Sequence, residues 1–243
     1  MIDEDINEMI EKIGMYINRK NYFNIKIDGE IKEKKINLAI PLLNVMSENE
    51  NKEEIKKIIY EKYIWKNEFK KRRDIKRLSK YSIEKVKTNY FKTLLKGEFT
   101  HAIRYGNELF LRDKDEFEKI SLFYGMINNQ KSYLLLYIIS SIELFKKVKK
   151  ENYIIILNSM IDLMSKYKKD FTLYEKIESG KYEENQVEKD NIYSIVYKYT
   201  LDYFFGNYDH PKKDTLYKIL KVLQKSEIKL ELKEEKIIYE KFI

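Results

Sequence analysis

The chain has 243 residues, of which 43% are hydrophobic and 36% are charged, and its formal net charge is +8. This composition is typical of a folded, basic protein and not of a disordered chain. Seven glycines and two prolines are too few for the tight turns of a β-sandwich or barrel. The lack of cysteine excludes disulfides, thiol nucleophiles and cysteine zinc sites. We therefore expect an all-α protein built from antiparallel helical hairpins, arranged as an α-solenoid or an irregular bundle.

The N-terminal part predicts three helices and one ambiguous segment. Apolar residues at helical spacing predict a helix over residues 3–20. Residues 24–40 contain Asp28-Gly29 between two short apolar runs, which indicates either a β-hairpin or a loop between helices. Further helices are expected from Leu38 to Met46 and from about Glu53 to Arg77.

A series of helices is expected from residue 83 onward. Gly97 predicts a glycine cap after one helix, and Asp113 to Asp115 offers an N-cap for another. The polar segment 180–190 separates an expected helical, repeat-like domain (1–180) from a C-terminal helical segment (181–243) packed on it. The tail is expected to be a helix or an edge strand. The expected helices span 83–96, 99–112, 115–127, 132–149, 152–168, 171–178, 191–205 and 215–224.

Two segments are similar to each other at a distance of 34 residues. KGEFTHAIRYGNELF (96–110) aligns with QKSYLLLYIISSIEL (130–144), so that Phe99 corresponds to Tyr133 and Ala102 to Leu136. A period between 20 and 50 residues is typical of stacked helical repeats. In the first copy, Phe99, Ala102 and Ile103 form an i, i+3, i+4 stripe after the turn at Gly97, and the small Ala102 allows a neighbouring helix to approach closely.

This pattern of Gly97, Phe99, Ala102 and Ile103 resembles the second helix of a tetratricopeptide repeat, and the resemblance covers about residues 83–148. It implies a non-enzymatic interaction module that binds a protein or peptide partner in a groove lined by the first helix of each hairpin. The chain departs from the family at Tyr90 and Tyr124, where the first helix prefers a small residue. An ordinary packing of helical hairpins is the alternative interpretation. The groove residues implied by the resemblance are Lys87, Phe91, Leu94, Ser121, Gly125 and Asn128.

Positive charge is concentrated between Glu61 and Lys96, where thirteen Lys and Arg residues and four acidic residues give a net charge of +9. Five of the basic residues recur at helical spacing and form one expected basic stripe. Trp65 and Phe69 flank the stripe, Leu78 is expected to face the core, and Ser79 is expected at the surface. The expected basic stripe consists of Lys66, Lys70, Arg73, Arg77 and Lys80.

A basic stripe beside aromatic residues can neutralise phosphates and stack a base, although a solvated helix face has the same pattern. The alternative function is therefore a nucleic-acid-binding regulator, or a factor in phage or bacterial conflict, that uses the basic helix at 66–80.

Motifs for catalysis or metal binding are absent from the sequence. It contains no glycine-rich phosphate loop, no Gly-x-Ser-x-Gly elbow and no His-Glu-x-x-His. His101 is expected to be half-buried in a helix, and His210 to lie in a turn. The most apolar stretch, Tyr133 to Phe145, would span about 20 Å as a helix, less than the roughly 30 Å core of a bilayer. We expect no enzyme activity, no cofactor, no metal, no membrane partner and a cytoplasmic location.

Overall fold

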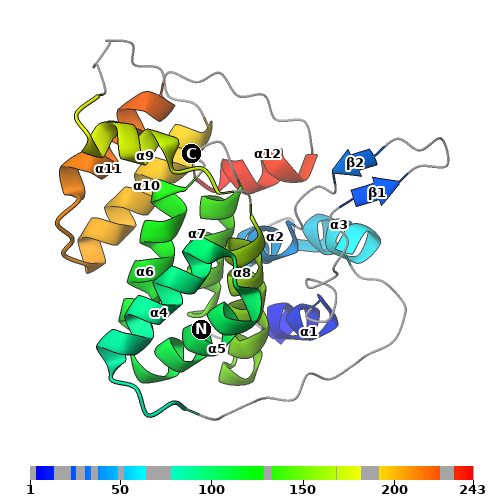
Figure 1. Ribbon diagram of the computed structural model, residues 1–243. Helices are drawn as coiled ribbons and strands as arrows, with labels where there is room; N and C mark the ends of the chain where they lie inside the picture. Colours follow the sequence, from blue (N-terminus) through cyan, green and yellow to red (C-terminus); the bar gives the residue numbers. More distant parts are fainter. Residues whose placement is uncertain are drawn as a thin grey trace.

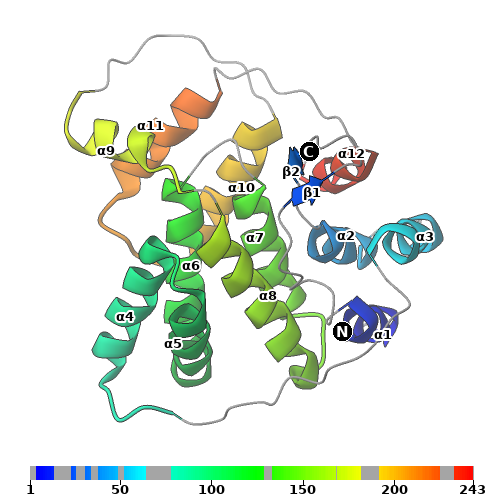
Figure 2. The ribbon, with the colours of Figure 1, turned by 45° about the vertical axis from the view of Figure 1, so that its right-hand side comes forward.

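The computed structural model describes residues 4–13, 23–25, 31–33, 38–48, 52–63, 78–128, 133–167, 169–181, 192–224 and 233–242. The regular structure in these ranges is helical apart from one short two-stranded hairpin, so the expected all-α class is confirmed. Figure 1 shows the helices α1 to α3 on one side of the central helices α6 to α8, and the helices α9 to α11 on the other side. In the view of Figure 2, α1 to α3 again lie on the right and α9 and α11 at the upper left, whereas α10 lies near the top of α7.

The N-terminal elements are α1 (Glu4–Ile13), the strands β1 (Phe23–Ile25) and β2 (Ile31–Glu33), and the helices α2 (Ala39–Met46) and α3 (Lys52–Tyr63). The two strands are antiparallel, with Ile25 opposite Ile31, which agrees with the hairpin interpretation, while Asp28-Gly29 itself lies outside the described residues. The part of the expected helix that would continue through 64–77 lies outside the described residues.

The remaining helices begin with α4 and end with α12. Most of their bounds agree with the predicted ones within two residues, and the described part of the tail, from Lys233 onward, is a helix and not a strand. Helix α7 ends five residues before the expected end. The N–H groups of Lys146 and Lys147 bond to the carbonyls of Glu143 and Leu144, three residues back, so the α-helical pattern stops there. The bounds are α4 (Ile83–Lys96), α5 (Phe99–Arg112), α6 (Lys114–Ile127), α7 (Leu134–Leu144), the 3-10 turn η1 (Lys150–Asn152), α8 (Tyr153–Lys166), α9 (Thr172–Glu178), α10 (Ile192–Asn207), α11 (Lys213–Leu223) and α12 (Lys233–Glu240).

Both predicted helix caps are present. Gly97 adopts a φ of 72°, and its N–H bonds to the carbonyl of Leu94 while that of Glu98 bonds to Thr93, which is the Schellman arrangement. A residue with a Cβ would be strained at this φ. The carboxylate of Asp113 accepts the N–H of Glu116 at 3.0 Å and caps α6. These caps fix the bounds of the α4–α5 hairpin and the start of α6.

Helix α7 forms the centre of the core. Every one of its residues from Leu134 to Leu144 is buried, and it contacts α2, α6, α8 and α10. The apolar stretch that contains it is therefore an internal helix. Among the described helices, none is both long enough and apolar enough to span a bilayer.

The helices close into a bundle. Helix α8 contacts α5 and α4 as well as α7, although α6 and α7 separate these elements in sequence. In an open solenoid each repeat contacts only its neighbours, so the bundle alternative fits the contacts better than the solenoid. The helices of the C-terminal segment pack on the rest, α10 against α6 and α7, α11 against α9, and α12 against α2. The division at residue 180 stays a prediction.

Candidate functional site

The residues expected to line a partner groove are mostly inside the protein. Leu94, Ser121, Gly125 and Asn128 are buried. The hydroxyl of Ser121 lies 3.2 Å from that of Tyr90, and the side-chain oxygen of Asn128 accepts the N–H of Asp170 at 2.9 Å. A Cβ added at Gly125 would lie 2.8 Å from Cδ1 of Ile138. These positions are filled by the protein itself.

The two groove residues that stay half-buried also join α4 to its neighbour. The Nζ of Lys87 lies 3.1 Å from carboxylate oxygens of both Glu84 and Glu116, and the ring of Phe91 packs on that of Phe123 with centroids 6.2 Å apart. These contacts join α4 to α6, and the partner groove stays a prediction.

The large Tyr90, which departs from the repeat pattern, is accommodated by a glycine on another helix. A Cβ added at Gly106 of α5 would lie 2.8 Å from Cε2 of Tyr90 and 2.5 Å from Cδ1 of Ile161 in α8. Gly106 lies one turn after Ala102, which is also fully buried. The face of α5 that carries these two small residues therefore allows close packing.

The expected basic stripe lies largely outside the described residues. Lys66, Lys70, Arg73 and Arg77 fall within 64–77, as do Trp65 and Phe69. Lys80 is described, and it is exposed in a bend between Leu78 and Ser82, so the helical spacing does not extend to it. Leu78 was expected in the core, but it is 51% exposed.

The segment 78–82 is held against the end of α5 by the carboxylate of Glu108, which is 6% exposed. This carboxylate accepts the N–H of Ser79 at 3.1 Å, its hydroxyl at 2.7 Å and Nη1 of Arg112 at 2.9 Å. Burial alone would raise the pKa of Glu108, but these donors hold it below its ordinary value. Ser79 is thus an anchor and not the free surface residue expected from the sequence.

Tyr81 is fixed by the same group of contacts. Its carbonyl accepts Nη1 of Arg112 at 2.8 Å, and its N–H donates to the hydroxyl of Ser79 at 3.2 Å. The side chain of Tyr81 nevertheless remains 48% exposed. Tyr81 thus combines an exposed aromatic side chain with a backbone that is fixed by hydrogen bonds.

One face of α4 is a polar surface whose residues are exposed apart from the half-buried Asn89. Val86, Tyr90, Thr93 and Leu94 are buried on the other side of the helix. At about 100° per residue, the five positions of the opposite face, listed below, fall within an arc of roughly 100° around the helix axis. The spacing of seven and four residues between the lysines was the signal that could have identified it. This surface, here called the lysine face, contains Lys85, Thr88, Asn89, Lys92 and Lys96.

Acidic residues lie beside the lysine face and not on it, with Glu84 next to Lys85 in sequence and Glu98 near Lys96. None of its five residues is acidic, and neither Lys85 nor Lys92 forms an ion pair with any residue that the structure describes. Lys96 lies 3.8 Å from Glu98 across the helix cap. By helix geometry, the distance from Lys85 to Lys96 is about 16 Å. The face is therefore an elongated cationic surface that begins next to Lys80 and Tyr81.

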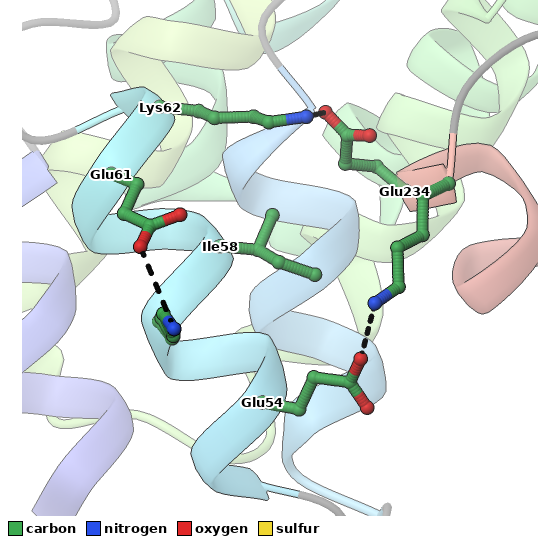
Figure 3. A pocket seen from close by; sticks show the side chains of 7 residues that line it. Glu54, Ile58, Glu61, Lys62 and Glu234 are labelled. Atoms are coloured by element: carbon green, nitrogen blue, oxygen red, sulfur yellow. Dashed lines mark hydrogen bonds and ion pairs between the residues drawn. The ribbon is translucent and has the colours of Figure 1, made fainter.

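A pocket of about 330 Å³ lies between α3 and α12 (Figure 3). Its lysines and glutamates neutralise one another, with Lys62 at 2.6 Å from Glu234, Lys233 at 2.5 Å from Glu54 and Lys57 at 3.9 Å from Glu61. The pocket lining contains no surplus charge and one apolar side chain, Ile58. Because these charges already pair with one another, the pocket has no unpaired charge to bind a charged ligand.

A ring of polar side chains joins α2, α7 and the end of α12. Asn44 donates to Glu143 at 2.6 Å and accepts Lys147 at 3.1 Å, and Lys147 lies 2.5 Å from Glu48. Lys241 completes the ring at 3.3 Å from Glu48 and 2.6 Å from Glu143. Burial lowers the pKa of Lys147. Burial would raise the pKa of Glu143, but the bonds from Lys241 and the hydroxyl of Tyr199 outweigh it and hold this pKa below its ordinary value. Because its charged groups pair with one another, we assign this ring a structural function, which is to hold α2, α7 and the end of α12 together.

The two histidines are not placed as a catalytic pair or metal site. His101 is exposed, contrary to expectation, because it lies on the outer face of α5. His210 lies in the expected turn, where its Nδ1 accepts the N–H of Lys212 at 3.3 Å, and burial lowers its pKa. In the ranges that the structure covers, no group of three His, Asp or Glu side chains is placed to hold a metal ion.

No protein-family model matches the chain, and neither curated proteins nor solved structures include a match. The tetratricopeptide-like assignment therefore remains a hypothesis based on Gly97 to Ile103 and its degenerate second copy.

Proposed function

We propose that the protein binds nucleic acid through the lysine face of α4 together with Lys80. The observation that carries the proposal is the exposure of Lys85, Lys92 and Lys96 on one face that has no acidic member. In sequence, this face belongs to the segment from Glu61 to Lys96 that holds a net charge of +9. The closed contact between α4 and α6 also weakens the groove-binding alternative.

Lysines that contact phosphates release the counterions bound to the nucleic acid. Each contact contributes about 0.7–0.9 to the slope of log affinity against log salt. Three lysines are therefore expected to contribute about 2–3 to this slope. If the proteins with and without these lysines bind equally at 1 M salt, where the electrostatic contribution vanishes, the slope gives roughly a 100-fold difference between their affinities at 0.15 M salt.

The test is a titration of labelled RNA and DNA, followed by fluorescence anisotropy at several salt concentrations. A variant with Lys85→Gln, Lys92→Gln and Lys96→Gln is expected to bind about 100-fold more weakly at 0.15 M salt, with a slope lower by about 2–3. Circular dichroism should show unchanged helix content, because the three side chains are exposed.

The matched control removes the same charge elsewhere. Lys198, Lys218 and Lys236 are exposed on α10, α11 and α12, and changing all three to Gln is expected to alter binding by no more than a few-fold. An equal loss in the two triple variants would mean that only the net charge matters. No binding by the unaltered protein would reject the proposal.

The basic residues upstream of α4 enter the proposal on sequence grounds alone. A variant with Arg73, Arg77 and Lys80 changed to Glu is expected to weaken binding, because it replaces attraction to phosphate with repulsion. If this variant binds normally while the lysine-face variant does not, the site is confined to α4 and its immediate neighbours.

Protein binding is the second candidate function. It is favoured by three large hydrophobic side chains on the segment 78–81 and the end of α5, namely Leu78, Tyr81 and the 66% exposed Leu111. The test is co-purification from the native host after nuclease treatment. A protein that stays bound after nuclease treatment, and is lost when Leu78 and Leu111 are changed to Ser, would favour this function over the first.

A further inference from the structure

We propose that the nucleic acid is single-stranded and that one of its bases stacks on Tyr81. This inference rests on the proposed function and adds to it the class of ligand. Aromatic side chains beside a cationic track are the usual means of holding single strands, because every base offers a face for stacking.

The first argument is the rigidity of the Tyr81 backbone. Both its N–H and its carbonyl are hydrogen-bonded, to Ser79 and Arg112, and these two residues are held in turn by Glu108. An exposed residue in a connecting segment would ordinarily gain its hydrogen bonds from water. Here the buried carboxylate of Glu108 fixes the segment, so the backbone that carries the exposed ring is held in place.

The second argument is the chemistry of the ring. A tyrosine side chain has only two rotatable bonds, so it loses little conformational entropy when a flat ligand stacks on it. The ring of Tyr81 is 48% exposed and takes no part in the aromatic contacts found among the described residues. It therefore has a surface available for a base.

The third argument is position. Tyr81 precedes the N-cap Ser82, so the residue lies directly before α4, after Lys80 and four positions before Lys85 in the first turn of the helix. The roughly 16 Å length of the lysine face is enough to contact several successive phosphates of a strand. A strand whose phosphates follow the lysines would bring a base near Tyr81 at one end.

A continuous duplex does not fit this arrangement. Its internal bases stack on one another and present only their edges in the grooves. Tyr81 can therefore stack only on a base that is unpaired. Selection for single strands follows from the ring, whereas the lysines contact phosphates of either form.

The experiment compares a labelled 12-nucleotide single strand with a 12-base-pair duplex whose two ends are each closed by a non-nucleotide linker, so that the duplex contains no unpaired base. Tyr81→Ser is expected to weaken single-strand binding roughly 5- to 150-fold, the range for loss of one stacked base. The salt slope should stay unchanged, because stacking releases no counterions. Duplex binding should also stay unchanged.

Two further variants separate stacking from general disturbance. Tyr81→Phe retains the ring and is expected to bind within about two- to threefold of the unaltered protein. Tyr217→Ser removes another exposed tyrosine, 38% exposed on α11, and is expected to have no effect on binding. Circular dichroism establishes that all three variants remain folded.

The outcomes distinguish the inference from the proposed function. If Tyr81→Ser binds the single strand normally, or if the unaltered protein binds the duplex as tightly as the strand, the stacking inference is wrong. The nucleic-acid function would still stand if the lysine-face variant lost binding in a salt-dependent way. If the protein binds neither ligand, both are rejected.

Discussion

Gly106 offers the sharpest test of the packing. Replacing it with Ala adds one methyl group where α5 approaches α4 and α8. The new Cβ would lie 2.5 Å from Cδ1 of Ile161 and 2.8 Å from Cε2 of Tyr90. Cδ1 is the end of a flexible side chain, but the fully buried ring of Tyr90 is stacked on Phe117 with centroids 5.4 Å apart and cannot easily move.

Two effects of opposite sign determine the change in the free energy of unfolding. Alanine is favoured over glycine inside a helix by about 0.8–1.0 kcal/mol. Overpacking of a core costs about 1–3 kcal/mol. We expect Gly106→Ala to destabilise the protein by up to about 2 kcal/mol, because the fixed ring places the cost in the upper part of its range.

Gly206→Ala is the matched control, because Gly206 lies in α10 and nothing would lie within 4 Å of its new Cβ. It should be neutral or stabilising, so the two variants should differ by about 1–3 kcal/mol in urea unfolding. Ile161→Val removes Cδ1, and its cost should be smaller in the Gly106→Ala background than alone. Equal stabilisation by both glycine changes would refute the close approach of α5 to its two neighbours.

Three further predictions concern stability. Ala102→Leu is expected to cost about 1–3 kcal/mol in urea melts, since Ala102 is fully buried on the same face as Gly106; a negligible cost would contradict that packing. Glu143→Gln is expected to cost about 3 kcal/mol, the lower end of the range for breaking a buried pair, because Lys241 would lose one charged partner but keep Glu48 at 3.3 Å. Glu8→Gln, at an exposed pair with Lys12, is the control and should have a much smaller effect. The pKa values of Glu143 and Glu108 are lowered by folding from an ordinary 4.5, so the stability that they supply is complete above about pH 4.5 and is lost as the pH falls through the lower folded values. The urea midpoint should therefore fall as the pH is lowered below about 4.5, less steeply in Glu143→Gln, and a midpoint independent of pH would contradict the ion pairs.

The sequence predicted features that depend on neighbouring residues along the chain. The bounds of the helix 99–112 follow from Gly97 and Asp113, which act on the backbone within a few residues. The β-hairpin at Asp28-Gly29 was one of two alternatives, because a short apolar run fits either a strand or a loop. The residues next to the helix 99–112 were enough to predict its bounds, whereas those around Asp28-Gly29 did not distinguish a hairpin from a loop.

The site was less predictable because it depends on contacts that are distant in sequence. Tyr90 is buried where a small residue was expected, since room for it comes from Gly106 and the helix that carries Ile161. Ser79 became an anchor because Glu108, 29 residues later, accepts its hydrogen bonds. The lysine face could be recognised only when the buried side of α4 was known.

The polar ring has a consequence for synthesis of the chain. All residues of α2 are buried, and the ring that joins its end to α7 includes Lys241. At about 5–20 residues per second, the ribosome needs roughly 10–40 s to add the residues between Glu48 and Lys241. During this time α2 can pack on α3 and α7, which are synthesised earlier, but the part of its apolar surface that α12 covers is open to chaperones and proteases. In ribosome-bound chains of increasing length, we expect cleavage near α2 to stop only when Lys241 has emerged; earlier protection would show that α2 is secured without the ring.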